Sequence, residues 1–308
     1  MNLAVTGSTG FLGGHLTGAL AKAGHGVVCI ERDTHARPAG FSASIVARGD
    51  ITNLRFMERV LADYGVECVI HLAAQTAVGT AMQEPISTFK SNIEGTWTVL
   101  EACRRQKVKR VIVASTDKSY GWTPPPYKES DAVRATWPYE TSKACADLLA
   151  QCYEKSYGMN VAVTRCGNFY GPGRLNWSTL IPMTIKNILE GKKPVLRSDG
   201  TFRRDFMHID DAVSAYLALV GSDVTGAFNF GTGEPSRVID VVNLICELMG
   251  WTGGVTIIDD AKSEIVDQYL DCTKAREKLG WTAKIQIREG LERTIPWYVE
   301  HLKREVKT

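Results

Sequence analysis

Apolar residues recur along this chain in short runs that are bounded by glycine, asparagine and charged residues. The runs that have the character of buried strands cover residues 3–6, 27–30, 69–72, 111–114 and 161–164. Between them, residues 54–61 and 92–104 carry apolar side chains at the three- and four-residue spacing of a helix that is buried on one side. Strands that alternate with helices of this length predict βαβ units. The fold class is therefore α/β, with a doubly wound parallel sheet covered by helices on both faces.

The second half of the chain is less regular. One more strand is expected at residues 227–230, but residues 167–204 and the stretch after 234 are richer in proline, glycine and tryptophan. We predict a larger α/β domain made of residues 1–166 and 205–233. Residues 167–204 and 234–308 would form a smaller C-terminal lobe that binds the substrate.

Composition narrows the classes of partner. The chain has 308 residues, and 36 Lys plus Arg against 34 Asp plus Glu give a net charge of +2 without a long basic run. Neither nucleic acid nor an anionic membrane is expected as the main partner. No apolar stretch is long enough to span a bilayer, and the N-terminus enters a strand without the features of a leader. We expect a cytoplasmic protein. The eight cysteines are scattered without a C-x-x-C pair, so neither a disulfide framework nor a metal site is expected.

A glycine-rich loop follows the first predicted strand and opens a helix. Glycines in this position let the backbone approach a pyrophosphate, and the helix N-terminus offers amide donors to it. The G-x-x-G-x-x-G spacing therefore predicts a Rossmann-type dinucleotide-binding domain, with a tight turn that binds nothing as the alternative. The residues expected to contact the cofactor here are Gly7, Thr9, Gly10, Phe11, Leu12 and Gly13.

The end of the second strand bears on the choice between NAD and NADP. A carboxylate at Glu31 would accept hydrogen bonds from the adenosine ribose and repel a 2′-phosphate, which favours NAD. Arg32 keeps NADP open, because an arginine at this turn can hold that phosphate.

Two further segments are expected to contact the cofactor. Asp50 and Ile51, which lie between the strands at residues 27–30 and 69–72, would cover the adenine, although Asp50 could equally be a helix cap or turn residue. Leu72-Ala73-Ala74 supplies small side chains that let the cofactor lie close to the sheet.

Candidate catalytic groups follow the 111–114 strand. Tyr139 and Lys143 are spaced to share one face of a predicted helix, and Thr116 stands at the end of the strand. An ammonium group one turn away would stabilise the tyrosine phenolate and lower its pKa, while Thr116 steers the substrate hydroxyl. The implied step is hydride transfer between a sugar-like carbinol and the nicotinamide.

Next to Thr116 stand an acid and an amine, Asp117 and Lys118. On this tripeptide and two other segments, the whole chain resembles the extended short-chain dehydrogenases that act on nucleotide sugars, and most closely the CDP-glucose 4,6-dehydratases. The other two segments are Leu175-Asn176-Trp177-Ser178 and Gln268-Tyr269-Leu270-Asp271.

The resemblance implies an internal redox cycle. Tyr139 takes the proton of the sugar 4-hydroxyl during oxidation at C4. Asp117 protonates the departing 6-hydroxyl, and Lys118, or a group that it positions, takes the C5 proton. A lysine can be this base only if its amine is neutral. The alternative is that Lys118 pairs with Asp117 and only orients it. Hydride return to C6 gives a 4-keto-6-deoxy sugar.

The resemblance also implies substrate contacts. Arg204 would bind the diphosphate, because a planar guanidinium binds phosphate oxygens bidentately, although it could be a surface arginine instead. Asn168 and Asn176 would donate hydrogen bonds to the diphosphate or sugar, or else be turn residues. Gln75 is expected to contact the substrate, and Leu196 to lie beside the pyrimidine base and ribose.

Two rival functions stay open: a nucleotide-sugar 4-epimerase or decarboxylase of the same superfamily, and a non-catalytic NAD-binding sensor or scaffold. A homodimer is implied by the resemblance, through the helix at residues 92–104 and the one that begins near Tyr139. Trp97, Leu100, Leu148 and Leu149 on these helices could equally be core.

Overall fold

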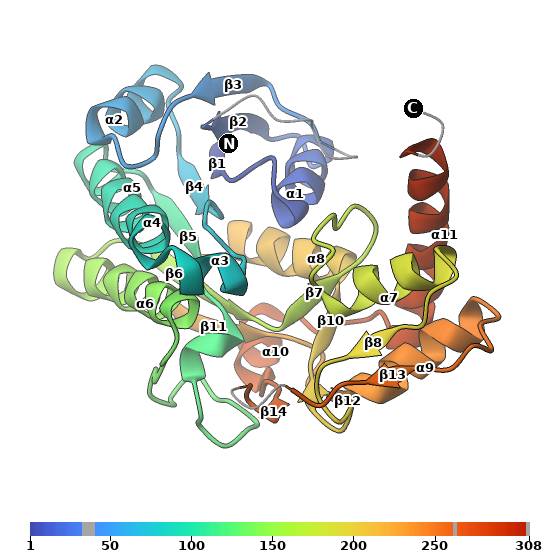
Figure 1. Cartoon of the computed structure of the whole chain (residues 1–308). Helices are drawn as coiled ribbons and strands as arrows, with labels where there is room; N and C mark the ends of the chain where they lie inside the picture. Colours follow the sequence, from blue (N-terminus) through green and yellow to red (C-terminus); the bar gives the residue numbers. More distant parts are fainter. Residues whose placement is uncertain (33–40, 261–263, 306–308) are drawn as a thin grey trace.

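The centre of the molecule is a seven-stranded parallel sheet with the strand order β11–β6–β5–β4–β1–β2–β3 (Figure 1). The structure is a computed structural model, and it describes residues 1–32, 41–260 and 264–305. The strands of this sheet are β1 (Asn2–Thr6), β2 (Gly26–Glu31), β3 (Ile45–Arg48), β4 (Cys68–His71), β5 (Arg110–Ala114), β6 (Val161–Cys166) and β11 (Gly226–Phe230). The Rossmann-type doubly wound sheet predicted from the apolar runs is thereby confirmed. The bounds of the six strands that were given ranges differ from the prediction by at most two residues, and β3 was given no range.

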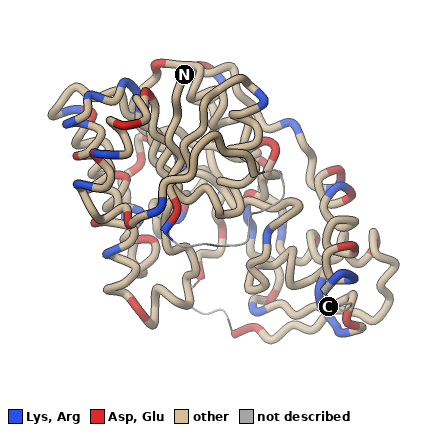
Figure 2. Tube along the Cα trace, turned by 90° about the horizontal axis from the view of Figure 1, so that it is seen from above, with Lys and Arg blue, Asp and Glu red and all other residues tan. Residues whose placement is uncertain are grey.

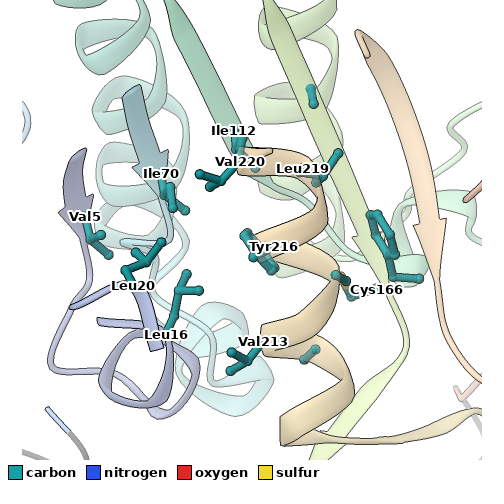
Figure 3. Close-up of a cluster of buried hydrophobic side chains, with 14 of the residues drawn as sticks. Val5, Leu16, Leu20, Ile70, Ile112, Cys166, Val213, Tyr216, Leu219 and Val220 are labelled. Atoms are coloured by element: carbon teal, nitrogen blue, oxygen red, sulfur yellow. The ribbon is translucent and has the colours of Figure 1, made fainter. Parts of the chain in front are cut away.

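Helices cover both faces of this sheet. One face carries α1 (Phe11–Lys22), α8 (Ile209–Val220) and α10 (Thr273–Leu279), and the other carries α2 (Leu54–Asp63), α5 (Gly95–Arg105) and α6 (Pro138–Tyr157). Neighbouring strand residues point to opposite faces, so Val5 packs against α1 and α8 (Figure 3) while Ala4 packs against the other layer. This two-sided burial is why the strands are continuous apolar runs and do not alternate with polar residues.

The helix predicted over residues 92–104 starts differently from the expectation. It is preceded by the short helices α3 (Val78–Gln83) and α4 (Pro85–Phe89), and it opens with a π-helical turn, η1 (Lys90–Glu94), before α5 begins. The side chain of Asn92 in this turn donates to Gln75 O (2.9 Å) and to Ser142 Oγ (2.9 Å). The turn therefore ties the loop after β4 to helix α6.

A second region packs around its own apolar core. Tyr170, Ile185, Val242 and Leu291 are among the buried residues of that core. Its elements are β7 (Asn168–Tyr170), α7 (Leu180–Leu189), β8 (Val195–Leu196), β9 (Arg203–Arg204), β10 (Phe206–His208), β12 (Ser236–Arg237), α9 (Val238–Leu248), β13 (Thr256–Ile257), β14 (Asp267–Gln268) and α11 (Ile287–Glu305). The domain boundaries drawn from the sequence stay a prediction, and residues 261–263 and 306–308 of the predicted lobe lie outside the described residues.

Charge is spread over the chain. Figure 2 shows Lys and Arg interspersed with Asp and Glu over both regions, as the net charge of +2 leads one to expect. Within the described ranges, none of the helices is long and apolar enough to cross a membrane. The same residues contain no group of three or more His, Cys, Asp or Glu that could hold a metal ion.

Candidate active site

A cavity of about 1590 Å³ opens at the carboxyl ends of the central strands. Its walls come from the segments that follow β1, β2, β3, β4, β5 and β6, together with residues of α6 and α11. Ligands of open parallel sheets bind at this edge, near the point where the strand order reverses. Here that point lies between β1 and β4.

The glycine loop forms one wall of the cavity. Gly7 has a left-handed φ of +69°, and a Cβ there would lie 2.7 Å from Ala73 N. A Cβ on Gly13 would lie 2.2 Å from Gly7 O, so the turn into α1 can only be made this tightly without side chains. The N-terminus of α1 faces the cavity, where its free amides suit a pyrophosphate. The lining includes all the residues predicted in this loop: Gly7, Thr9, Gly10, Phe11, Leu12 and Gly13.

Of the two cofactor contacts predicted at the end of β2, one lines the cavity and the other does not. Ile30 and Arg32 line the cavity, whereas Glu31 between them is buried and does not, because neighbouring residues of a strand point to opposite sides. The structure therefore does not bring the carboxylate predicted to meet the ribose to the cavity wall.

Asp50, Ile51 and Leu72-Ala73-Ala74 all line the cavity. The Asp50 carboxylate accepts hydrogen bonds from the backbone N–H and the hydroxyl of Thr52, both at 2.9 Å. The helix cap of α2 is Asn53, whose side chain accepts from Phe56 N. Asp50 is therefore not the helix cap but does make the hydrogen bonds of a turn residue, and its contact with the adenine stays a prediction.

Strand β5 delivers Thr116 and Asp117 to the cavity through a 3₁₀ turn, η2 (Asp117–Tyr120). The Thr116 hydroxyl donates to Asp117 Oδ1 at 3.0 Å, while Oδ2 is buried without a hydrogen-bond partner. Burial raises the pKa of Asp117 to about 6, against the lowering effects of the Lys118 charge and the Thr116 hydrogen bond. Asp117 is therefore a carboxyl group that holds its proton unusually well.

A network of buried polar side chains holds η2 in place. The Tyr120 hydroxyl donates to Asn229 Oδ1 at 2.7 Å and accepts from Arg165. Arg165 also forms a buried ion pair with Asp147 of α6, with its Nε 2.8 Å from Oδ2. Removing one member of such a pair typically costs about 3–5 kcal/mol, because the other charge is left buried and unpaired. These contacts hold the turn that carries the acid.

Lys118 does not form the ion pair with Asp117 that was the alternative to its role as a base. Its Nζ donates to Gln268 Oε1 at 3.1 Å, and within the described part of the chain no ion pair joins it to Asp117. The amine lines the cavity beside the acid. The proton-accepting role of Lys118 stays a prediction.

Helix α6 contributes Tyr139 and Lys143, and both side chains line the cavity. Burial raises the pKa of Tyr139 to about 12, while a hydrogen bond with Thr116 and the charge of Arg174 act in the opposite sense. The expectation of a lowered tyrosine pKa is therefore wrong for the protein without ligands. Burial also lowers the pKa of Lys143 to about 8. For Tyr139, the cost of burying a charged phenolate outweighs the stabilisation expected from a lysine one helical turn away.

The predicted substrate contacts are only partly brought to the cavity. Asn168 and Asn176 line it. The Asn168 Nδ2 is buried and has no partner, so it is a donor available to a ligand. The Asn176 side chain accepts from Ser178 N and Oγ, which is the turn role considered as its alternative.

Gln75, Leu196 and Arg204 lie off the cavity wall. The Gln75 amide donates to Ala77 O at 3.1 Å within its own loop, and Leu196 is buried in the core of the second region. Arg204 Nη1 donates to Arg203 O and to Val266 O, both at 2.9 Å. Their expected substrate contacts stay predictions.

Several cavity residues were missed by the sequence reasoning. Arg174 is one: its Nη1 donates to Phe169 O at 2.8 Å, and its guanidinium lies 5.5 Å from the centre of the Phe11 ring. Four residues of α11 also line the cavity, namely Trp297, Glu300, His301 and Arg304. Their spacing marks one helix face, but the sequence does not say what that face meets.

Comparison with known proteins places the chain. Residues 3–231 match the NAD dependent epimerase/dehydratase family, and the chain belongs to this family. It is 32% identical over 320 residues to a dTDP-glucose 4,6-dehydratase of Streptomyces griseus, covering 97% of this chain and 94% of that protein. The resemblance to nucleotide-sugar enzymes of this superfamily and the prediction of NAD as cofactor are both confirmed at this level.

Two further relatives show the range of the family. The chain is 31% identical over 317 residues to a trifunctional UDP-glucose 4,6-dehydratase, epimerase and reductase of Arabidopsis thaliana. That match covers 97% of this chain but only 47% of the plant protein, so the chain spans about half its length. The structure of a UDP-glucose 4-epimerase of Thermotoga maritima with UDP-glucose superposes with a TM-score of 0.93 at 29% identity, covering 98% of this chain and all of that one. The chain is thus an enzyme of a family that contains both dehydratases and epimerases.

Proposed function

We propose that this protein is a nucleotide-hexose 4,6-dehydratase. The observation that carries the proposal is Asp117, a buried carboxyl group on the cavity wall with an unpartnered oxygen and a pKa raised to about 6. Elimination of water across C5 and C6 needs an acid that protonates the leaving hydroxyl, and such an acid works best with a pKa near the working pH. A 4-epimerase has no leaving hydroxyl and needs no acid at this position.

The first step oxidises C4. Bound NAD supplies the hydride acceptor that this oxidation requires and the hydride donor for C6 at the end. Tyr139 takes the proton from the 4-hydroxyl, which Thr116 orients by hydrogen bonding. The charge of Arg174 favours the phenolate, and an ammonium at Lys143, one helical turn away, would favour it as well. Burial and the Asp117 charge raise the pKa of Tyr139 to about 12 even with the Arg174 charge acting against them, so the phenolate needs further stabilisation for the tyrosine to act as a base near neutral pH.

The second step eliminates water. The ketone at C4 acidifies the proton on C5, and Lys118 takes that proton in its neutral form. Asp117 gives its proton to the departing 6-hydroxyl, which leaves as water. The two groups are adjacent on η2 and line the same cavity, so one turn of backbone carries the acid and the base.

The preferred nucleotide is proposed to be CDP, with glucose as the sugar. Support comes from the Thr116-Asp117-Lys118 tripeptide, which resembles the CDP-glucose enzymes, whereas the dTDP-glucose enzymes carry glutamate in place of the lysine. The relatives compared above act by name on dTDP- and UDP-sugars, so the base is the first point to test.

Incubation with NAD and each of CDP-, dTDP-, UDP- and GDP-glucose in deuterated water tests the proposal. A product lighter by one water, with deuterium at C5, is expected from the CDP sugar alone. The variant Asp117→Asn removes the proposed acid. Its matched control is Asp63→Asn, at an exposed position outside the cavity, which should behave like the wild type. An isomer of unchanged formula would mean that the protein is an epimerase, and dehydration of a different sugar would refute the CDP assignment alone.

A homodimer is proposed from an exposed apolar hollow on α5 and α6. Trp97 and Leu148 are 45% and 56% exposed, and with Ile93, Cys145, Leu149 and Cys152 they line this hollow. Leu100, one of the expected interface residues, is instead fully buried in the core. We expect Leu148→Glu to convert the dimer to a monomer in light scattering. Ile258→Glu, at a position exposed to 55% in the other region, should not.

A further inference from the structure

The amine of Lys118 is held by a residue from a distant part of the chain. Its Nζ lies 3.1 Å from Oε1 of Gln268, which is 150 residues away in sequence. Lys118 belongs to the turn after β5, whereas Gln268 belongs to β14 in the second region. The contact therefore links the region that binds the cofactor to the region predicted to bind the nucleotide.

Gln268 is held firmly by its backbone. Its carbonyl accepts from Asp205 N at 3.1 Å, and β14 pairs in parallel with β9, with Gln268 in register with Arg204. The side chain is 1% exposed and its Nε2 has no partner, so the bond to Lys118 is the hydrogen bond that this side chain makes. A buried amide that leaves one of its hydrogen bonds unmade destabilises the fold relative to a satisfied one. An apolar side chain would fill this position without that cost, which indicates that the amide serves Lys118.

The chemistry of the acceptor matters as much as its position. An amide oxygen accepts an N–H bond from an ammonium and from a neutral amine alike, so it fixes Nζ in space without adding a charge. Asp117 on η2 and Glu140 on α6 are the carboxyl groups whose pKa the Lys118 charge lowers. A third carboxylate at residue 268 would favour the charged amine still further.

We propose that Gln268 is a positioning residue, which holds the Lys118 amine beside Asp117 while leaving it free to lose and regain a proton. Its register with Arg204 means that the same pair of short strands carries the predicted diphosphate contact and the residue that orients the amine. The inference rests on the proposed dehydratase function. It adds a requirement for a neutral hydrogen-bond acceptor at residue 268.

Two measurements test the inference separately from the function. The first is competitive acetylation of the Lys118 amine by acetic anhydride at a series of pH values, read by mass spectrometry of the peptide, which needs no substrate. The second is net dehydration of the nucleotide-glucose that the wild type turns over. The variants are Gln268→Ala, Gln268→Asn and Gln268→Glu. Val266→Ala, at an exposed position two residues away, is the control.

Gln268→Glu should move the acetylation midpoint of Lys118 and the acidic limb of the dehydration profile to higher pH, because a carboxylate favours the charged amine. Gln268→Ala should lower kcat for dehydration by up to about 10²-fold with little change in KM, as expected when a reacting group is misplaced. Gln268→Asn, which keeps the amide but shortens it, should lie between. In a Lys118→Met background, Gln268→Ala should have no further effect.

The outcomes separate the two proposals. Unchanged acetylation profiles in all three variants, or an effect of Gln268→Ala that persists in the Lys118→Met background, would overturn the positioning role. If the wild type dehydrates none of the four nucleotide-glucoses, the function is refuted, and the acetylation profiles still decide whether Gln268 governs the Lys118 amine. Melting temperatures of the variants identify any loss of activity that is due to unfolding. If Gln268→Ala unfolds, the positioning role is judged from Gln268→Asn, which keeps the amide.

Discussion

The cavity contains two pairs of ionisable groups that are built differently. Tyr139 and Lys143 lie on one face of the long helix α6, and burial moves their pKa values to about 12 and about 8. Asp117 and Lys118 lie on a 3₁₀ turn of four residues, where burial raises the pKa of the acid to about 6 and the amine reaches across to β14. The first pair is positioned by one helix, whereas the second depends on contacts from both regions. The difference suggests that oxidation at C4 and elimination at C5 and C6 can be disabled separately.

The largest effect should come from the first pair. Tyr139→Phe removes the group that takes the hydroxyl proton, so both oxidation and net dehydration should fall by about 10³-fold. Reduced nicotinamide absorbance in a single turnover and product mass measure the two steps. Tyr153→Phe, on the same helix with its hydroxyl bonded to Glu101, is the control and should stay near wild type. A Tyr139→Phe enzyme with more than about a tenth of wild-type activity would contradict the assignment.

Asp117→Asn should separate the pairs. Asparagine keeps the shape and one oxygen of the side chain but cannot give up a proton, so net dehydration should fall by about 10²-fold. Oxidation at C4 should remain within about threefold of wild type, because it depends on the other pair. Trapped 4-keto sugar that still carries its 6-hydroxyl would be the product seen by mass spectrometry. An equal loss of both steps would show that the two pairs are not independent.

The same substitution should stabilise the fold at high pH. Folding raises the pKa of Asp117 from its usual 3.8 to about 6, so the folded state favours the protonated acid and loses that preference as pH rises through 6. At about 1.4 kcal/mol per pKa unit, Asp117→Asn should gain about 3 kcal/mol at pH 8. Denaturant unfolding at about pH 8 and pH 4 measures it, and the gain should nearly vanish at the lower value. A gain that does not change with pH would point to packing and not to charge.

The smallest expected effect is the order in which three cavity groups lose their protons as the pH rises. In the ligand-free protein Asp117 should lose its proton near pH 6 and Lys143 near pH 8, with Tyr139 still protonated at both. The protonated-carboxyl infrared band that is absent from the Asp117→Asn spectrum reports the first of these. If this band is already lost when the pH is raised to about 4, the Asp117 carboxyl is more solvated than its burial indicates.

Much of the fold was predictable because it depends on local patterns of residues. The strands beginning at Asn2, Cys68 and Arg110 are continuous apolar runs, since both faces of the sheet are covered. The glycine loop was equally plain, because the turn tolerates no side chain at Gly7 or Gly13. The π-helical turn at the start of the α5 segment was not predictable, because its sequence keeps ordinary helical periodicity and the turn serves the contacts of Asn92.

The catalytic candidates were predictable from the sequence, whereas their pKa values and part of the cavity wall, such as Arg174, were not. By itself the sequence determined the parallel sheet, the glycine loop and the candidates Thr116, Asp117, Tyr139 and Lys143, because each depends on residues close together in the chain. Only the tertiary structure decided that burial raises the pKa of Tyr139 and Asp117 and that Gln268 holds Lys118. Desolvation and contacts across 150 residues depend on how the whole chain packs, and no local pattern records them.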